Sequence, residues 1–302
     1  PMTPTTEPAS TAAAEPATDP ASDAVRRHAA PCRLGVVAYL NTLPLIAGLE
    51  SCEGLELDHA VPSELADRLL DGRSELALCS AFDHQASPAP LAIVPVGMLG
   101  CRGATMTVRL YSRVPMARVR RVHADTDSHT SVMLLSVLFR ERHRVAVDLV
   151  PFDTRGPAPA EPPESLLLIG DKVIVDAPDH RRYPFQLDLG EAWLESFGLP
   201  FVFATWMCRA DLDEAARARI RTAAKLLDRQ RRHNRSRIPA IVHRHAIGRG
   251  WPRFDAELYL GRMLRYDLDE EAKAGLARFF ELAAAHGLIE SPRPIEFLPL
   301  DE

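Results

Sequence analysis

The stretch Tyr39-Leu40-Asn41-Thr42-Leu43-Pro44 places a short polar loop between two apolar segments. The preceding run, residues 34–40, is apolar and predicts a buried strand. Polar side chains that follow a strand lie at its carboxyl end, where open α/β sheets bind their ligands. Asn41 and Thr42 are therefore candidate ligand-binding residues, and the alternative is a polar turn that only closes the strand.

Other predicted strands also carry small hydroxyl side chains. A short buried run ends at Ser80, and the run 105–111, rich in Val and Thr, contains Thr105 and Thr107. Because strand-like and helical segments alternate along the chain, we predict the α/β class. The length of 302 residues is sufficient for a full core and two lobes, and the Pro-containing segment 112–115 is a candidate crossing between them.

Hydroxyl side chains gather again before the helical run 132–140, where Ser128, Thr130 and Ser131 follow a predicted strand. Such residues cap the first N–H groups of a helix. The N–H groups that remain, together with the positive end of the helix dipole, attract an anion. Capping alone and carboxylate binding are both open for this segment.

Two further positions are candidates for the same cleft. Gly170-Asp171 follows the buried strand 166–169, and a glycine there permits a positive φ angle or a close backbone approach. Asp171 either caps the loop or faces the cleft. Trp206 lies in the aromatic-rich strand 201–207.

The composition limits the class of protein. With 46% hydrophobic and 25% charged residues the chain is typical of globular proteins, and its formal charge of -5 favours neither nucleic acid nor a membrane as a partner. The five cysteines are scattered and form no CxxC pair, which indicates reduced thiols in a cytoplasm and no structural zinc site. Residues 1–32, rich in Ala and Pro, predict a disordered leader rather than a signal peptide.

The common motifs for cofactor chemistry are missing from the sequence. It contains no GxGxxG, no Walker A loop, no GxSxG elbow and no HExxH. The sequence therefore predicts neither a nucleotide cofactor nor a metal. Asn, Ser and Thr side chains at strand ends and helix starts suit a small anionic ligand in a cleft.

Blocks of sequence distributed along the chain carry a family resemblance. The most specific are 188–193, Asp-Leu-Gly-Glu-Ala-Trp, and 198–204, Gly-Leu-Pro-Phe-Val-Phe-Ala, which Trp206 and Arg209 follow. The other blocks are 39–44, 103–112, 128–135 and 167–171. Together they cover most of the chain from about residue 33 to 300, and they resemble the chorismate dehydratase family of the futalosine route to menaquinone.

The resemblance implies a two-lobed fold similar to type II periplasmic binding proteins, with two hinge crossings. One lobe would hold residues 33–111 and 204–302 and the other residues 112–203, so that the crossings fall near Ser112 and Ala204. It also implies that chorismate, a dianion, is the substrate and is dehydrated without a cofactor to 3-[(1-carboxyvinyl)oxy]benzoate. The oligomeric state stays open.

The resemblance also implies roles for the candidate residues. Asn41 would be catalytic and orient the reacting end of chorismate. The candidate substrate-binding residues are Thr42, Ser80, Thr105, Thr107, Ser128, Thr130, Ser131, Asp171 and Trp206. Because these candidates include no obvious general base, the substrate's own enolpyruvyl carboxylate would take the ring proton.

The chain departs from the family's usual pattern at three positions of interest. The family commonly has Ser where this chain has Thr107, an acidic residue at Lys172 and Tyr at His84. Thr107 keeps a hydroxyl, whereas Lys172 and His84 could alter ligand preference. His84 could be a base, but we expect an exposed loop histidine.

Three alternative functions follow from the same sequence. A related enzyme of the pathway cleaves a cyclic futalosine derivative to a dihydroxynaphthoate and relies on a histidine; the loop 40–44 favours the dehydratase over it. A non-enzymatic solute-binding protein is disfavoured by the lack of a signal sequence. A ligand-sensing regulatory domain would need a DNA-binding segment, and the sequence before residue 33 does not contain one.

Overall fold

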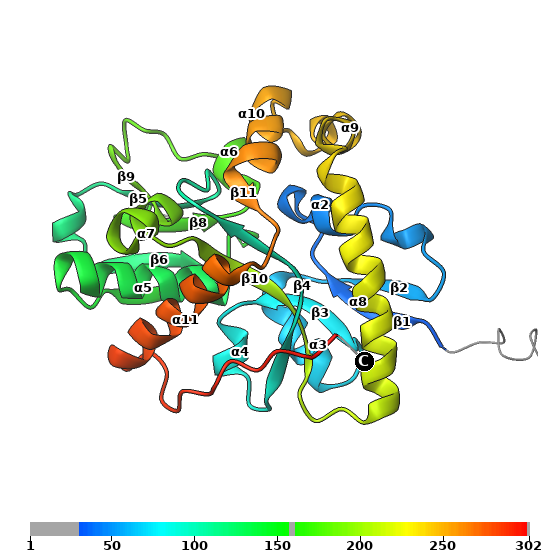
Figure 1. Cartoon of the computed structure of the whole chain (residues 1–302). Coiled ribbons are helices and arrows are strands. Elements are labelled where there is room, and N and C mark those ends of the chain that lie inside the picture. The colour runs from blue at the N-terminus through cyan, green and yellow to red at the C-terminus, as the bar shows by residue number, and fades with distance from the viewer. Residues whose placement is uncertain (1–29, 157–160, 301–302) are drawn as a thin grey trace, which may run out of the picture.

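In the residues that the structure describes, 30–156 and 161–300, the chain forms two β-sheets with helices packed around them (Figure 1). The structure is a computed structural model. Residues 1–29 of the predicted leader lie outside the described residues. The order of strands and helices confirms the predicted α/β class.

The first sheet has the strand order β11-β4-β10-β3-β1-β2. These strands are β1 (Cys32–Val36), β2 (Leu55–His59), β3 (Leu76–Ser80), β4 (Leu91–Cys101), β10 (Phe201–Arg209) and β11 (Leu264–Arg265). β1 runs parallel to β2 and β3, and β10 runs antiparallel to β3 and β4. The carboxyl ends of β1 and β3 therefore meet at one edge, where the loop 39–44 and Ser80 lie.

The second sheet has the strand order β7-β6-β8-β5-β9. Its strands are β5 (Val108–Ser112), β6 (Arg121–Asp125), β7 (Asp148–Phe152), β8 (Ser165–Ile169) and β9 (Phe185–Asp188). β6 runs parallel to β7 and β8, and β5 runs antiparallel to β8 and β9. The loops after β6 and β8 therefore emerge at the same edge.

The first crossing between the sheets differs from the predicted one near Ser112. β5 pairs with the second sheet along its whole length, and the Ser112 hydroxyl lies 2.9 Å from that of Ser165. The chain thus changes sheets between Cys101 and Val108. The pattern at 112–115 is a turn at the far end of β5, and turn residues alone do not distinguish such a turn from a crossing. The return crossing ends at Phe201, where β10 begins, slightly before the predicted Ala204.

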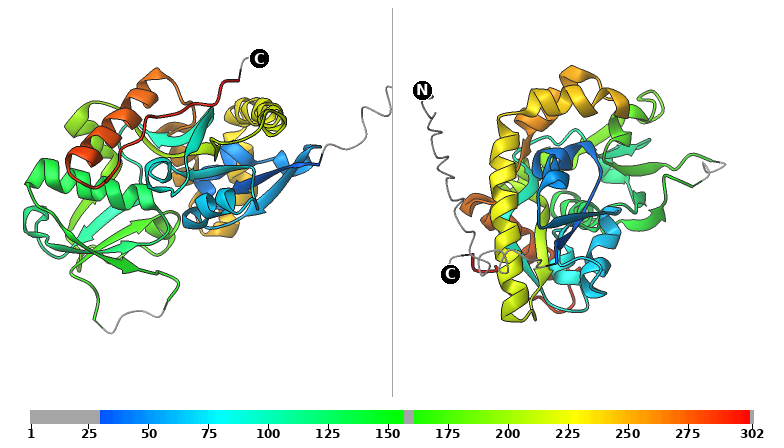
Figure 2. Two further views of the ribbon diagram at one scale, coloured as in Figure 1. Left: turned by 90° about the horizontal axis from the view of Figure 1, so that it is seen from below. Right: turned by 90° about the vertical axis from the view of Figure 1, so that its right-hand side faces the viewer.

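Helices flank both sheets (Figure 2). They are α2 (Leu43–Ile46), α3 (Leu65–Leu70), α4 (Asp83–Ala86), α5 (His129–His143), α6 (Lys172–Val175), α7 (Leu189–Phe197), α8 (Glu214–Arg235), α9 (Ile238–His245), α10 (Arg253–Leu258) and α11 (Glu270–Ala285), with a π-helical turn, η6, at Tyr259–Met263. The π-helical turn directly follows α10 in the chain.

Helix α11 joins the two lobes through a shared apolar core. It packs against α5 of the second lobe and β10 of the first. The ring of Phe279 on α11 lies 6.1 Å from Trp193 of the second lobe and 5.0 Å from Phe201 of the first, both edge-on. Aromatic pairs of this kind contribute about 0.5–1.5 kcal/mol each beyond the burial of their area. The core therefore stabilises one relative position of the lobes.

The basic face of α8 is paired with acidic side chains. Arg231 and Arg235 both contact Asp267, and Arg219 contacts Glu75 at 2.9 Å. These pairs offset the positive charge of the helix. No helix among the described residues is long and apolar enough to cross a membrane.

Candidate active site

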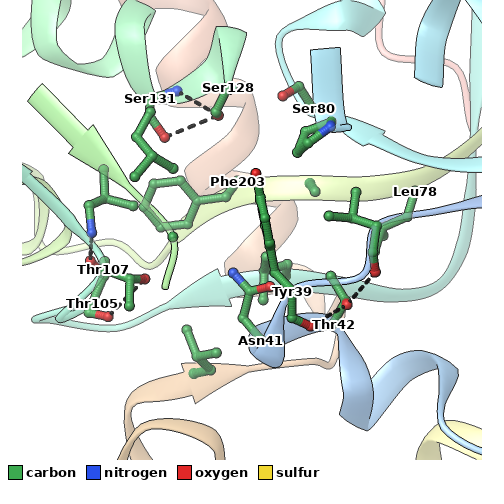
Figure 3. Close-up of a pocket in the computed structure, with 18 of the residues that line it drawn as sticks. Tyr39, Asn41, Thr42, Leu78, Ser80, Thr105, Thr107, Ser128, Ser131 and Phe203 are labelled. Carbon is green, nitrogen blue, oxygen red and sulfur yellow. Dashed lines mark hydrogen bonds between the residues drawn. The ribbon is translucent and has the colours of Figure 1, made fainter. Parts of the chain in front are cut away.

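A pocket opens between the two lobes at the carboxyl ends of β1 and β3 (Figure 3). The space between its atoms is about 630 Å³, a volume that includes open solvent at the mouth. Its polar lining residues are Tyr39, Asn41, Thr42, Ser80, Thr105, Thr107, Ser128, Ser131 and Tyr259. The fold thus brings most of the predicted site residues to one place.

The loop after β1 presents the side chain of Asn41 to the pocket. The Thr42 hydroxyl lies 2.7 Å from the carbonyl oxygen of Val37 and 2.9 Å from that of Tyr39, and it donates to them. This contact closes the loop, so the hydrogen of Thr42 is engaged within the protein. The Oδ1 atom of Asn41 is buried and has no hydrogen-bond partner among the described residues. An unpaired buried acceptor is costly, and a ligand donor would satisfy it.

The crossing segment supplies Thr105 and Thr107. Both residues precede β5 instead of lying in a strand, because Met106 between them has a φ of 59°. The buried carboxylate of Asp188 holds this turn by accepting the N–H groups of Thr105 at 2.9 Å and Met106 at 2.9 Å. The Thr105 hydroxyl accepts the N–H of Val108 at 2.9 Å. Thr105 therefore shapes the turn, and the Thr107 hydroxyl is directed toward the pocket.

Tyr259 is a site residue that the sequence did not reveal. Its hydroxyl lies 2.6 Å from that of Thr107, and its ring stacks on Trp251 at 5.1 Å with an interplanar angle of 12°. Tyr259 begins the π-helical turn η6, and such turns are frequent at functional sites. The position of a π-helical turn has no simple signal in a single sequence.

The start of α5 contributes Ser128 and Ser131. Ser128 is the N-cap: its hydroxyl oxygen accepts the N–H of Ser131 at 3.3 Å and lies 3.1 Å from the Ser131 hydroxyl. The first turn of a helix leaves N–H groups without intrahelical partners and carries the positive end of the dipole. Capping and a donor surface facing the pocket therefore coexist here, so the two sequence interpretations do not exclude each other.

The chemical character of the lining is apolar and uncharged. The ionisable groups among the described lining residues are the phenols of Tyr39 and Tyr259, and burial raises the pKa of both above the ordinary value. Phe203, Leu99 and Ile169 form part of the apolar wall. Gly170 takes the positive φ expected for it, +83°, and its Cα faces the Tyr39 ring. An anion in this pocket would be bound by hydroxyl and N–H groups without a salt bridge.

Three predicted site residues do not line the pocket. The Thr130 hydroxyl accepts the N–H of Phe82 at 3.0 Å, and Asp171 accepts that of Leu40 at 3.4 Å, so both join the lobes. Trp206 is 1% exposed and packs in the apolar core of the first lobe. In the sheet, Trp206 of β10 lies opposite Leu78, two residues before the end of β3, and its side chain is covered by the apolar core.

His84 is not the exposed loop histidine that we expected. It is 1% exposed, belongs to α4 and stacks on Phe280 at 5.9 Å. Burial lowers the pKa of His84 to about 4, so the imidazole is neutral at physiological pH. It does not line the pocket, and a role as base there is excluded by its position.

Comparison with known proteins defines the family. The model of a family described as menaquinone biosynthesis matches residues 32–285. The chain belongs to this menaquinone biosynthesis family. The match covers most of the sequence and confirms the resemblance seen in the sequence blocks. A chorismate dehydratase from Thermus thermophilus is 28% identical over 273 residues, which are 83% of this chain and 94% of that protein.

Solved structures confirm the two-lobed periplasmic-binding-protein-like fold of this family member. Protein AF1704 from Archaeoglobus fulgidus has a TM-score of 0.61 at 18% identity, covering 85% of this chain and 98% of its own. The Candida albicans CA3427 gene product, with the generic periplasmic binding protein fold, has a TM-score of 0.62 at 9% identity, covering 91% and 99%. The periplasmic aliphatic sulphonate binding protein SsuA from Escherichia coli has a TM-score of 0.58 at 15% identity, and the match covers 89% of this chain and 96% of SsuA. At these identities the likeness concerns the fold alone.

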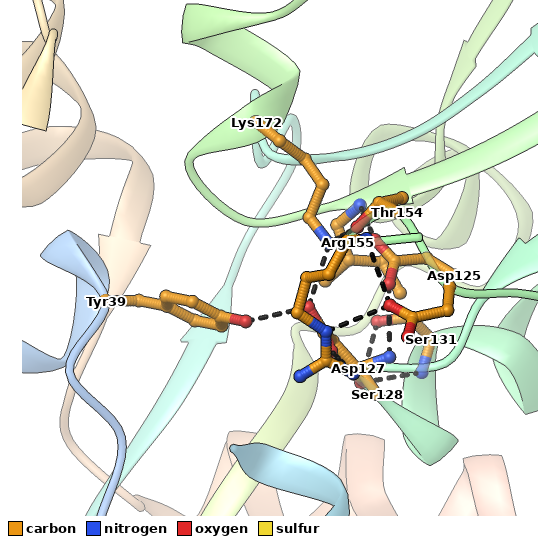
Figure 4. A network of polar contacts seen from close by, with 10 residues as sticks. Tyr39, Asp125, Asp127, Ser128, Ser131, Thr154, Arg155 and Lys172 are labelled. Carbon is orange, nitrogen blue, oxygen red and sulfur yellow. Dashed lines mark hydrogen bonds and ion pairs between the residues drawn. The ribbon is translucent and has the colours of Figure 1, made fainter. Parts of the chain in front are cut away.

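Tyr39 links the lobes beside the pocket through a polar network (Figure 4). Its hydroxyl donates to Asp127 of the second lobe at 2.8 Å. Lys172 contacts both Asp127 at 2.8 Å and Asp125 at 2.6 Å, and it also donates to Thr154. Burial acts to raise the pKa of Asp127, but the hydrogen bonds from Lys172 and Tyr39 outweigh it and hold the pKa below its usual value. The charge of Lys172 is thus neutralised outside the pocket.

A second contact between the lobes is titratable. Nδ1 of His129, at the start of α5, lies 2.6 Å from Oδ1 of Asp83, at the start of α4. The hydrogen bond to Asp83 raises the pKa of His129, and burial raises the pKa of Asp83. Asp67 lies near enough to both groups to raise their pKa values further. The pair therefore favours the protonated state, and the contact weakens as pH rises.

We expect the stability contributed by His129 to depend on pH. Because its pKa is raised in the folded protein, the contribution is complete below its unfolded pKa of about 6.5 and is lost as pH rises through the folded value. His129→Gln should lower the free energy of unfolding by on the order of 0.5–1 kcal/mol near pH 6, a value limited by the exposure of the imidazole. By pH 9 the difference should be much smaller, as measured by urea denaturation.

The control for this prediction is His180→Gln, at an exposed histidine whose nearest acidic partner is 3.8 Å away. This variant should not differ from the wild type at either pH. A constant difference between His129→Gln and the wild type from pH 6 to 9 would contradict a charged contact with Asp83.

Proposed function

We propose that this chain is a chorismate dehydratase, a hydro-lyase that converts chorismate to 3-[(1-carboxyvinyl)oxy]benzoate and water. Membership of the menaquinone biosynthesis family and the chorismate dehydratase relative support the proposal. The observation that carries it is the pocket itself, which combines a buried, unpaired Asn41 oxygen with hydroxyl donors and contains no charged side chain among its described lining residues. Those groups suit a polar anion that needs orientation more than acid–base help.

Chorismate has two carboxylates, and the start of α5 fits one of them. The hydroxyls of Ser128 and Ser131 lie beside the first turn of this helix of 15 residues, where N–H groups and the helix dipole stabilise negative charge. Thr107 adds a donor from the crossing segment. In this arrangement one carboxylate is anchored in the second lobe and the ring extends toward Asn41.

In the proposed complex, the Asn41 side chain contacts the ring hydroxyl of chorismate, which is the leaving group. Its Oδ1 accepts the hydrogen of the ring hydroxyl and so fixes the ring at the end of β1. The enolpyruvyl carboxylate of the substrate takes the proton from the ring carbon that carries the ether. The hydroxyl leaves from the adjacent carbon and combines with that proton as water, and the new double bond completes an aromatic ring. Aromatisation drives the reaction, so the protein contributes mainly orientation and water exclusion.

The pocket also distinguishes this function from the alternatives. An enzyme of the related type that relies on a histidine would need one in the cleft, and no histidine is among the described lining residues. The five cysteines are all free thiols, which favours work in the cytoplasm over an exported binding protein. Only a measurement of turnover distinguishes a non-enzymatic carboxylate-binding protein from the enzyme.

The purified protein should convert chorismate without added metal or nucleotide. Loss of chorismate should match the appearance of a product lighter by one water, measured by chromatography with mass detection. A heat-denatured sample controls for spontaneous decay of chorismate. Binding of chorismate without product would replace the dehydratase by a carrier or sensor, and no binding at all would overturn chorismate as the ligand.

Asn41→Ala should reduce kcat/KM for chorismate by about 100-fold or more, comparable to the loss of one preorganised polar group in other active sites. The free energy of unfolding should change much less than turnover, because the Asn41 oxygen has no partner among the described residues and only its NH2 group faces Tyr259. The measurements are steady-state kinetics and thermal unfolding. A variant with near wild-type kcat/KM would remove Asn41 from the reaction.

Ser131→Ala should mainly weaken substrate binding. Loss of a hydrogen bond to a carboxylate costs about 1.5–3 kcal/mol, so KM should rise about 10-fold or more. The matched control is Ser136→Ala on the same helix, whose hydroxyl donates to the Val132 carbonyl oxygen away from the pocket. Equal KM values for the two variants would place the carboxylate elsewhere.

A further inference from the structure

Tyr259 lies where two polar elements of the pocket meet, the loop after β1 and the crossing segment. It is 1% exposed, it lines the pocket, and its ring is fixed by the stacked Trp251. Its hydroxyl contacts Thr107 at 2.6 Å, and the side chain of Asn41 is near enough to lower the pKa of Tyr259, as a donor to the phenol oxygen does. One residue of the C-terminal half thus contacts both the loop after β1 and the crossing segment.

The number of hydrogens decides how these groups are oriented. A tyrosine hydroxyl has one hydrogen to donate and can also accept, whereas an amide has a donor end and an acceptor end. Because Oδ1 of Asn41 has no partner among the described residues, the NH2 group of Asn41 is the end that faces the Tyr259 oxygen. The hydrogen of Tyr259 is then left for the oxygen of Thr107.

The same count leaves two groups available to a ligand. Thr107 accepts from Tyr259 and points its own hydrogen at the carbonyl oxygen of Thr105, 3.4 Å away, a long contact that a closer ligand oxygen can replace. Asn41 presents its carbonyl oxygen. The pocket therefore offers one donor at Thr107 and one acceptor at Asn41, and their polarity is set by Tyr259.

We propose that Tyr259 is a positioning residue that fixes the Asn41 amide with its oxygen toward the substrate and turns the Thr107 hydroxyl into a donor. This inference rests on the proposed dehydratase function and adds a residue to it. Burial raises the pKa of Tyr259 well above its ordinary value, so the phenol keeps its hydrogen across the physiological range. It acts by orientation and does not take a proton from the substrate.

Tyr259→Phe tests the proposal, because phenylalanine keeps the ring and its stacking on Trp251. The variant should lower kcat for chorismate about 10- to 100-fold, since a misoriented amide no longer matches the leaving group. The matched control is Tyr266→Phe, which removes a buried hydroxyl without a partner in the described part of the chain. The control should retain wild-type kcat, and thermal unfolding of both variants should stay near that of the wild type.

A second measurement reports on the amide itself. The sequence contains two asparagines, Asn41 and Asn234, so selective 15N labelling of asparagine gives two side-chain NH2 groups in an NMR spectrum. Asn234 donates to the Ala47 carbonyl oxygen at 2.8 Å and serves as an internal reference. Tyr259→Phe should shift the Asn41 NH2 signals and leave those of Asn234 in place. Tyr266→Phe should move neither, and Asn41→Ala assigns the spectrum.

The two measurements separate failure of the inference from failure of the function. If the wild type does not convert chorismate, the dehydratase proposal fails, whereas the NMR shift still tests the contact between Tyr259 and Asn41. An unchanged Asn41 signal in Tyr259→Phe would overturn the inference. A shifted signal with unchanged kcat would also overturn it, because the orientation would then have no effect on the reaction.

Discussion

The carboxylate of Asp188 is the interaction on which the site depends. It is 6% exposed and accepts N–H groups from the first crossing segment, Thr105 and Met106, and from the first turn of α7, Gly190 at 3.1 Å and Glu191 at 3.2 Å. One side chain thus caps α7 and fixes the turn that carries Thr105 and Thr107. A carboxylate with this many N–H partners is strongly held, so the first crossing segment and the start of α7 form one unit.

This role explains why the block 188–193 is specific. A Cβ atom on Gly190 would lie 2.4 Å from Thr105 and 2.6 Å from Cys101, so only glycine fits where α7 approaches the first crossing segment. Trp193, fully buried, donates to the Pro200 carbonyl oxygen at 3.2 Å and packs on Phe201, the first residue of β10. The residues of this block therefore form the contact between α7 and the first crossing segment. Because this contact fixes the crossing segment, Thr107 lines the pocket.

The sequence predicted the parts of the site that depend on local structure. Asn41 and Ser80 follow from the rule that parallel strands bind ligands at their carboxyl ends, and Ser128 follows from helix capping. It failed where long-range packing decides. Trp206 lies on a central strand and is covered by helices of its own lobe, and Tyr259 reaches the pocket only because the C-terminal half returns across the first lobe.

The lack of charge in the pocket agrees with the proposed chemistry. A carboxylate paired with arginine or lysine has a lowered pKa and is a poor base, whereas burial among apolar groups raises its pKa. Lys172, a cation in the network of Tyr39, is already bound by Asp125 and Asp127. Neutral hydroxyls can therefore orient the substrate without weakening its own carboxylate as the base. On this argument, a new cation in the pocket would strengthen binding and slow the reaction.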